Sequence, residues 1–213
     1  MTRLIFIRHG ESLGNAQRKF LGHTDWDLSE KGYLQAKRTA EYLRDAHIDK
    51  IYSSDLMRAY NTVVPVAQIH GLEIVKDAEL REIWAGKWEG MAFDDIQKVY
   101  PEGHNAWMTD IGNAVCDGGE SVAALQRRVN AAVLRIVEEN RGKTVCIGTH
   151  ATPIRTMLCA WQNLPVTEAK NITWVTNASV TIVDYDEKGS ATLVLAGYAD
   201  HLSDICSDEL KNI

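Results

Sequence analysis

The sequence lacks an apolar run that could cross a membrane. Uninterrupted apolar stretches, for example Leu4–Ile7, have the length of a β-strand, whereas a transmembrane helix needs about 20 predominantly apolar residues. No hydrophobic signal-peptide region follows Met1. These absences predict a soluble, cytoplasmic protein without a membrane partner.

Paired cysteines and basic runs are also missing. No C-x-x-C pair occurs among Cys116, Cys146, Cys159 and Cys206, and no metal-ligand spacing relates His23, His47, His70, His104 and His201. We therefore expect no metal and no cofactor. The 23 basic residues are outnumbered by 29 acidic residues, and because no basic patch is present, we expect no nucleic-acid partner.

What the sequence does contain is an alternation of strand-like runs with helical periodicity. Strand-like runs occur near residues 3–7, 51–53, 73–75 and 144–148, and helical segments near 30–45, 54–69 and 120–140. This alternation is typical of β-α units on a largely parallel sheet. A chain of 213 residues that is 45% hydrophobic can bury one substantial core. We predict a single α/β domain over residues 1–213.

The C-terminal third modifies this architecture. Two β-rich runs, 179–185 and 191–196, flank the turn-like segment 186–189 and predict a hairpin. The expected fold is therefore a three-layer α/β/α domain with a mixed, mostly parallel sheet. Residues 83–119, rich in Trp and Gly, predict a lid-like insertion with short helices, and the last dozen residues predict a tail.

The most informative motif is Arg8–Ser12, which directly follows the apolar run Leu4–Ile7. Open α/β sheets carry out chemistry outside the carboxyl ends of their strands. An unprotonated imidazole can attack phosphorus, and a guanidinium offers paired N–H donors to phosphate. Taken alone, the motif fits a structural role as well as a catalytic one. In the structural role, the arginine ends a strand and the histidine is held by hydrogen bonds.

Two further residues follow predicted strands in the same way. Arg58 falls in the first turn of a predicted helix, and His150 stands where the strand 144–148 ends. Parallel strands bring their carboxyl ends to one edge, so we expect His9, Arg58 and His150 to converge there. Nearby helix N-termini add N–H donors for an anion.

The chain resembles the histidine phosphatase superfamily, in the branch related to cofactor-dependent phosphoglycerate mutases. The resemblance rests on motifs in order along the chain: Arg8–Ser12 with Asn15, 27–32, 53–56 with 58–59 and Thr62, 80–82, Gly86, 88–90, 118–121 and 148–150. It implies a phosphoglycerate mutase-like fold and a metal-independent phosphatase that forms a phosphohistidine.

The resemblance also implies a role for each site residue. His9 is the implied nucleophile; Arg8, Arg58 and His150 are implied to bind the phosphoryl oxygens, and Asn15 to add a polar contact. Fixed cations stabilise the charge that spreads over the transferring phosphoryl group.

Glu82 is implied to be the general acid that protonates the leaving alkoxide and later accepts a proton from water. Trp84 and Trp88 lie nearby in sequence and can partly desolvate its carboxyl group.

Two positions depart from the family pattern. Gly14 replaces a common aromatic and predicts more room beside the substrate, and Lys19 replaces a common Arg, which weakens paired contacts to a second anionic group.

The segment after Glu82 bears on the outcome of the reaction. Mutases of the family carry a longer insertion there, whereas Met91–Asp117 is compact, so hydrolysis of a phosphomonoester is favoured over mutase-type transfer. The acidic side chains of this segment argue against a substrate with several phosphates. We expect a small phosphorylated metabolite as substrate. A non-catalytic phosphate-binding module remains as a further alternative function. For the assembly, a homodimer is left open.

Overall fold

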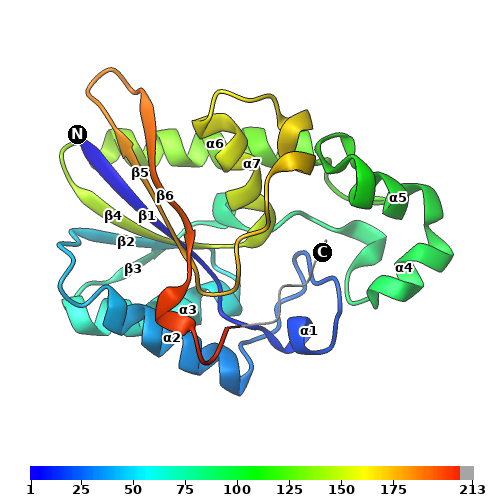
Figure 1. The fold of residues 1–213 in the computed structure, drawn as a ribbon, viewed down its shortest axis with the longest axis horizontal. Helices are drawn as coiled ribbons and strands as arrows, with labels where there is room; N and C mark the ends of the chain where they lie inside the picture. Colours follow the sequence, from blue (N-terminus) through cyan, green and yellow to red (C-terminus); the bar gives the residue numbers. More distant parts are fainter. Residues whose placement is uncertain (207–213) are drawn as a thin grey trace.

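A six-stranded sheet forms the centre of the molecule (Figure 1). The structure is a computed structural model that describes residues 1–206. The strands are β1 (Thr2–Arg8), β2 (Lys50–Ser53), β3 (Ile74–Lys76), β4 (Thr144–Thr149), β5 (Val180–Tyr185) and β6 (Ala191–Tyr198), in the order β3-β2-β4-β1-β5-β6. Neighbours among β1 to β4 run parallel, while β5 is antiparallel to both β1 and β6. The prediction of a mixed, mostly parallel sheet is confirmed.

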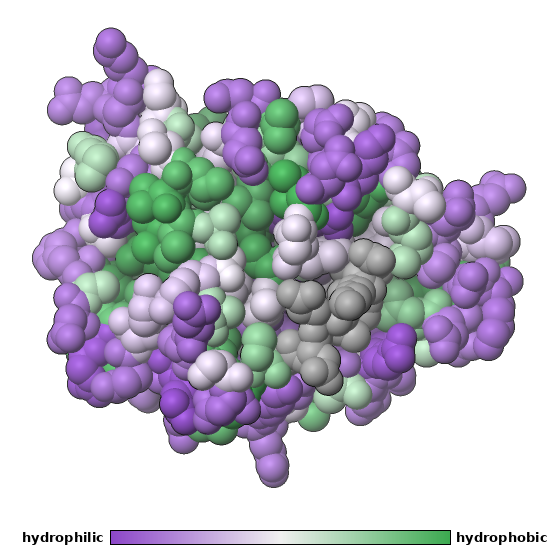
Figure 2. Space-filling model, in the orientation of Figure 1, coloured by the Kyte–Doolittle hydropathy of each residue, from purple (hydrophilic) through white to green (hydrophobic). Residues whose placement is uncertain are grey.

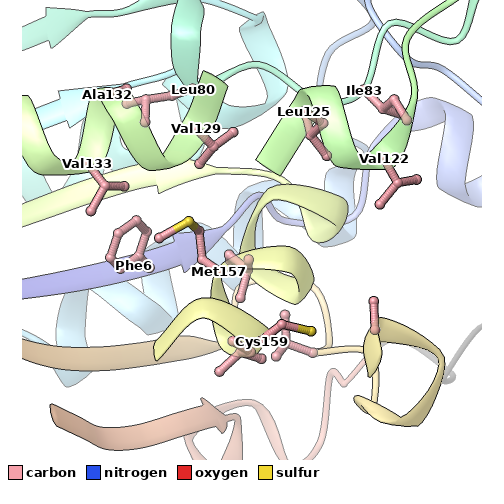
Figure 3. Close-up of a cluster of buried hydrophobic side chains, with 14 of the residues drawn as sticks. Phe6, Leu80, Ile83, Val122, Leu125, Val129, Ala132, Val133, Met157 and Cys159 are labelled. Carbon is pink, nitrogen blue, oxygen red and sulfur yellow. The ribbon is translucent and has the colours of Figure 1, made fainter. Parts of the chain in front are cut away.

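Helices cover both faces of the sheet and make three layers (Figure 1). They are α1 (Leu13–Ala16), α2 (Glu30–Tyr42), α3 (Met57–His70), α4 (Phe93–Val99), α5 (Pro101–Thr109), α6 (Val122–Glu139) and α7 (Ala151–Trp161). Side chains alternate across a strand, so Leu4 and Phe6 of β1 pack with α6 and α7, while Ile5 and Ile7 pack with α2 and α3. Figure 3 shows the first of these two cores, in which Phe6 lies near Val133 and Met157.

Two helices begin at residues other than the nearby polar side chains that could cap them. Helix α3 has Leu56 as its N-cap in place of Ser54 or Asp55, because the Asp55 carboxylate is bound to Arg81 and the Ser54 hydroxyl is engaged elsewhere. Helix α7 has His150 as its N-cap in place of Thr152. By contrast, Ser29 does cap α2, accepting a hydrogen bond from Gly32 N.

The segment 83–119 packs onto the rest of the fold through aromatic side chains. Trp88 and Trp107 are buried and meet Phe20 edge to face at ring distances of 5.6 and 5.0 Å. Helices α4 and α5 lie at one end of the molecule (Figure 1). A lid function for this segment stays a prediction.

The chain is still structured where the predicted tail of the last dozen residues begins. Asp200–Leu202 forms a 3-10 helix that packs on α2, and Gln35 Nε2 of α2 donates to the Ile205 carbonyl over 2.9 Å. The rest of the predicted tail, 207–213, lies outside the described residues.

The surface shown in Figure 2 is mostly hydrophilic, with apolar side chains gathered over β5 and β6. On β6, Val194 is half exposed. Within residues 1–206, every helix is too short or too polar to span a bilayer.

Candidate active site

His9 lies directly beyond the carboxyl end of β1, where its N–H donates to the Thr149 carbonyl at the end of β4. Its side chain is only 4% exposed. The Nδ1 atom lies 2.7 Å from the Gly10 carbonyl oxygen, which can only accept, so Nδ1 carries the proton and Nε2 keeps a free lone pair. Burial, together with the charges of Arg58 and Arg8, holds the pKa of His9 well below 6.5. The imidazole is therefore neutral, as a histidine nucleophile requires.

Gly10 is needed because the turn after His9 packs tightly against α2. A Cβ atom at Gly10 would stand 2.6 Å from the Gly32 carbonyl oxygen. On the other side, Gly10 N donates to Thr62 Oγ1 of α3 over 2.9 Å. The turn that presents the His9 imidazole is therefore fixed between two helices.

Arg58, in the first turn of α3, brings a buried cation to the site. Its side chain is 1% exposed, and its two Nη atoms donate to the carbonyl oxygens of Thr24 and Gly22 over 2.9 and 2.7 Å. Burial lowers the pKa of Arg58 to about 10, which leaves the guanidinium charged at neutral pH.

Arg8, the last residue of β1, is a second cation of the same kind. It donates through Nη1 to the Val175 carbonyl, and its buried Nε has no partner within residues 1–206. Burial lowers its pKa to about 10. The Glu82 charge acts on both Arg8 and Arg58, but no carboxylate hydrogen-bonds to either guanidinium in the described part of the chain.

His150 is fully buried at the N-terminus of α7. Its ring stands edge to face with the His9 ring at a centroid distance of 5.2 Å. Its Nε2 lies 2.8 Å from Ser54 Oγ, and its buried Nδ1 has no partner among residues 1–206. Burial, followed by the charge of Arg58, holds the pKa of His150 well below 6.5. His150 is therefore neutral, which excludes the cationic form for the unliganded site.

Glu82 reaches the site from the segment that precedes the insertion. Its Oε1 accepts from Ile83 N over 2.8 Å, and its Oε2 accepts from Thr152 N, in the first turn of α7, over 3.3 Å. Trp84 is 50% exposed and Trp88 is buried among the aromatics of the insertion, and neither lines the pocket beside Glu82.

A pocket of about 580 Å³, part of it open to solvent, joins these residues. It is lined by Arg8, His9, Ser12, Asn15, Lys19, Phe20, Leu21, Gly22, Arg58, Glu82, Phe93, Ala151, Thr152 and Trp174. Five of the six predicted site residues therefore line one pocket, and the sixth, His150, is buried beside His9. The aromatics at the pocket are Phe20, Phe93 and Trp174, in place of the predicted tryptophans.

Asn15 is oriented by its own helix start. Its Oδ1 accepts from the backbone N and the hydroxyl of Ser12, both over 3.0 Å, and from Asn177 Nδ2 over 3.4 Å. With the oxygen occupied in this way, the Nδ2 amino group is left to donate to a bound anion. The prediction that Gly14 leaves room beside the substrate is wrong, because the Leu21 side chain fills that space and a Cβ at Gly14 would stand 2.4 Å from it.

The segment before β5 contributes to the site without a sequence motif. Asn177 Nδ2 donates to the His9 carbonyl over 3.0 Å, and Ala178, at φ 57°, donates its N–H to the same carbonyl. The signal that leads to these residues is topological: a strand antiparallel to β1 must begin beside the end of β1. Within residues 1–206, no group of three or more His, Cys, Asp or Glu side chains is placed to hold a metal ion.

Together these residues place a neutral histidine beside two charged guanidinium groups at the edge of an α/β sheet. The family model of the histidine phosphatase superfamily (branch 1) matches residues 4–197. Phosphoserine phosphatase 1 of Hydrogenobacter thermophilus is 33% identical over 195 residues, covering 92% of each chain. Phosphoglycerate mutase-like protein 4 of Arabidopsis thaliana is 32% identical over 208 residues, covering 95% of this chain and 88% of its own.

Solved structures of other proteins share the fold of this chain. YhfR of Bacillus stearothermophilus superposes with a TM-score of 0.91 at 31% identity, covering 95% of this chain and all of its own. The chain belongs to the histidine phosphatase superfamily, and its fold is of the phosphoglycerate mutase type. The predicted enzyme class, a phosphatase of this superfamily, is confirmed.

Proposed function

We propose that the protein hydrolyses a phosphomonoester of a small metabolite through a phosphohistidine at His9. The observation that carries this proposal is the neutral, buried imidazole of His9 beside two guanidinium groups that hydrogen-bond to backbone carbonyls and to no carboxylate among the described residues. In the proposed site Arg8 and Arg58 hold the phosphoryl oxygens, and Asn15 and His150 add N–H donors. These cations stabilise the charge spread over the transferring group.

The reaction then runs in two displacements. The lone pair of His9 Nε2 forms a bond to phosphorus while the bond from phosphorus to the alcohol oxygen breaks, and the Glu82 carboxyl gives its proton to that oxygen. Water next attacks the phosphohistidine as the N–P bond breaks, and the Glu82 carboxylate takes the proton from water. Inorganic phosphate leaves, and His9 and Glu82 return to their starting protonation states.

The direct test is an assay of the folded wild type on a generic aryl phosphate such as p-nitrophenyl phosphate. We expect steady release of phosphate. No turnover at any pH from 5 to 8 would favour the alternative of a non-catalytic phosphate-binding module.

Mutase-type transfer is the second candidate, because a relative that matches 95% of this chain carries a mutase-like name. The two outcomes separate in one ³¹P NMR experiment with 3-phosphoglycerate. A phosphatase releases inorganic phosphate, whereas a mutase accumulates the 2-phospho isomer. We expect hydrolysis.

Activity is expected to survive chelation. The groups proposed to offset phosphoryl charge are guanidinium and N–H donors of the protein, which EDTA does not remove. The check is the initial rate before and after dialysis against EDTA, with and without added Mg²⁺. We expect rates that agree within about twofold, and a rate restored only by Mg²⁺ would contradict the proposed metal-independent mechanism.

We further propose that Lys19 binds a second anionic group of the substrate. Its Nζ lies over the Trp26 ring at 5.1 Å, and no ion pair to Lys19 is formed within residues 1–206. Lys19 lines the pocket together with Arg8 and Arg58, which are assigned to phosphate. The relative named phosphoserine phosphatase supports a substrate that carries a carboxylate beside its phosphate ester.

Lys19→Met is therefore expected to raise KM for phosphoserine about 10-fold, because a charged hydrogen bond is lost. KM for phosphoethanolamine, which lacks the carboxylate, should change little. Michaelis curves for both esters provide the measurement, and Lys37→Met, at an exposed lysine of α2, is the control. Equal changes for both esters would refute the assignment.

A cytoplasmic location, the absence of nucleic-acid and membrane partners, and a possible homodimer stay predictions.

A further inference from the structure

Ser54 meets the second site histidine from the end of a neighbouring strand. It follows β2 directly, and its backbone N–H donates to the Gly148 carbonyl of β4 over 2.9 Å. This pairing brings Ser54 Oγ to 2.8 Å from His150 Nε2, and both side chains are fully buried. Ser54 Oγ also accepts a hydrogen bond from Leu56 N over 3.3 Å.

Only one arrangement of protons satisfies the Ser54 hydroxyl. If His150 Nε2 carried the ring proton, Ser54 Oγ would accept from both Nε2 and Leu56 N, and its own O–H would have no acceptor among the described hydrogen bonds. If the Ser54 O–H instead donates to Nε2, the hydroxyl uses its one proton and a lone pair. The first arrangement leaves two buried groups without a partner among residues 1–206, the Ser54 O–H and the Nδ1 lone pair of His150, whereas the second leaves only the His150 Nδ1–H. A buried polar group without a partner costs about 1–3 kcal/mol, so the second arrangement is favoured.

The ring proton of His150 then resides on Nδ1. The partner of one ring nitrogen sets the protonation of the other, and Nδ1 is the buried atom that has no partner within residues 1–206. His150 is thus a neutral imidazole with an unused N–H donor beside the His9 ring. An anion bound beside the two rings would supply the missing acceptor.

We propose that Ser54 is a positioning residue that fixes the Nδ1–H tautomer of His150, so that His150 donates a neutral hydrogen bond to a phosphoryl oxygen. That a phosphoryl oxygen accepts this hydrogen bond rests on the proposed function, whereas the tautomer of His150 does not. The two site histidines then share one tautomer and use it in opposite ways. His9 directs its Nδ1–H into the Gly10 carbonyl and frees Nε2 to attack phosphorus, while His150 accepts at Nε2 and frees Nδ1–H for the phosphate.

The tautomer is tested on the wild-type protein by ¹⁵N-detected two-bond correlation spectra of the histidine rings at neutral pH. The His150 signals are assigned by their loss in His150→Gln. The expected spectrum has the unprotonated nitrogen at Nε2 and the protonated nitrogen at Nδ1. A His150 ring protonated at Nε2 would overturn the inference, whatever the enzyme hydrolyses.

Ser54→Ala tests the consequence for anion binding. Without the hydroxyl donor, the Nε2 lone pair has no partner, and we expect the Nε2–H form to grow in the spectrum. The affinity for inorganic phosphate, measured by calorimetry, should fall about 10-fold, and kcat/KM should fall about 10- to 100-fold because one positioned donor is lost.

Ser53→Ala is the matched control. Ser53 is also fully buried, but its Oγ donates to the Ser54 carbonyl over 2.8 Å and makes no hydrogen bond to His150 in the described structure. We expect a similar loss of thermal stability in both variants, with phosphate affinity, kcat/KM and the His150 spectrum preserved in Ser53→Ala. Phosphate affinities within threefold of each other in the two variants would overturn the proposed role. Phosphate affinity and the ring spectra are read without turnover, so a failure of the hydrolase assignment is distinguished from a failure of this inference.

Discussion

Replacing His9 with alanine is expected to abolish turnover, lowering kcat by at least about 10⁴-fold. The loss follows from the covalent route, because the His9 ring is subject to the charges of both Arg58 and Arg8 and its Nδ1 proton is held by the Gly10 carbonyl, which leaves Nε2 as the nucleophilic nitrogen. Initial rates on an aryl phosphate provide the first measurement. The second is a rapid acid-free quench, in which wild type should carry a phosphoryl group that is stable in base and labile in acid, as a phosphohistidine is.

His47→Ala is the matched control for this result. The His47 side chain is exposed and pairs only with Asp49 in the described structure, so its removal should leave the rate unchanged. Phosphate should still bind to His9→Ala, since Arg8, Arg58 and Asn15 remain. Residual activity above about 1% of wild type, or a phosphorylated His9→Ala protein, would contradict the covalent mechanism.

The pH profile offers an independent view of the same residue. An imidazole is protonated as the pH falls, and protonated His9 cannot attack. Because burial and the two arginines hold its pKa well below 6.5, protonation of His9 occurs at lower pH than in an unfolded chain. We therefore expect kcat/KM of the free enzyme to show no acid limb from His9 near pH 6.5.

The part of the site that follows from strand order could be predicted from the sequence. Arg8, His9 and His150 stand beside runs of buried strand residues, and Arg58 stands in the first turn of a helix. Because β1, β4 and β2 are parallel neighbours, their carboxyl ends meet at one edge of the sheet. No knowledge of side-chain contacts is needed to predict this. This convergence is a property of backbone topology, which periodicity reports well.

Side-chain competition could not be predicted in the same way. Ser54 has the chemistry of a helix cap, but His150 engages its hydroxyl, and the two residues are 96 positions apart in sequence. The Gly14 prediction failed for a related reason, since the Leu21 side chain folds back over it. Such outcomes depend on which groups the tertiary fold brings within 3 Å, and local sequence carries no record of them.

The orientation of Glu82, the proposed acid, is a second case of this kind, because its motif alone does not orient a carboxylate. In the structure Glu82 is held at both oxygens by backbone N–H groups, one from Ile83 and one from the start of α7. Arg128 of α6 adds hydrogen bonds to the carbonyls of Glu79, Arg81 and Glu82. The segment that carries Glu82 is therefore fixed to both helices on that face of the sheet.

Glu82→Gln is expected to slow alkyl phosphates far more than aryl phosphates. An alkoxide is too basic to leave without a proton, and loss of the general acid costs about 10²–10⁴-fold. A nitrophenolate leaves without help, so its release should be slowed less than about 10-fold in the step that forms phosphohistidine. The measurement is kcat/KM for phosphoserine and p-nitrophenyl phosphate in wild type and variant, because this ratio reports the first displacement alone.

The control for Glu82→Gln comes from the same segment. Glu79 is exposed three residues earlier, and Glu79→Gln removes the same charge without touching the pocket, so both esters should be hydrolysed at wild-type rates. Glutamine keeps the size of Glu82, and its single carbonyl oxygen can still accept from Ile83 N, the nearer of the two N–H groups, but it has no acidic proton to give. If Glu82→Gln slowed both esters by the same factor, Glu82 would act by holding the pocket in shape, and the proton for the leaving alcohol would have to come from another group.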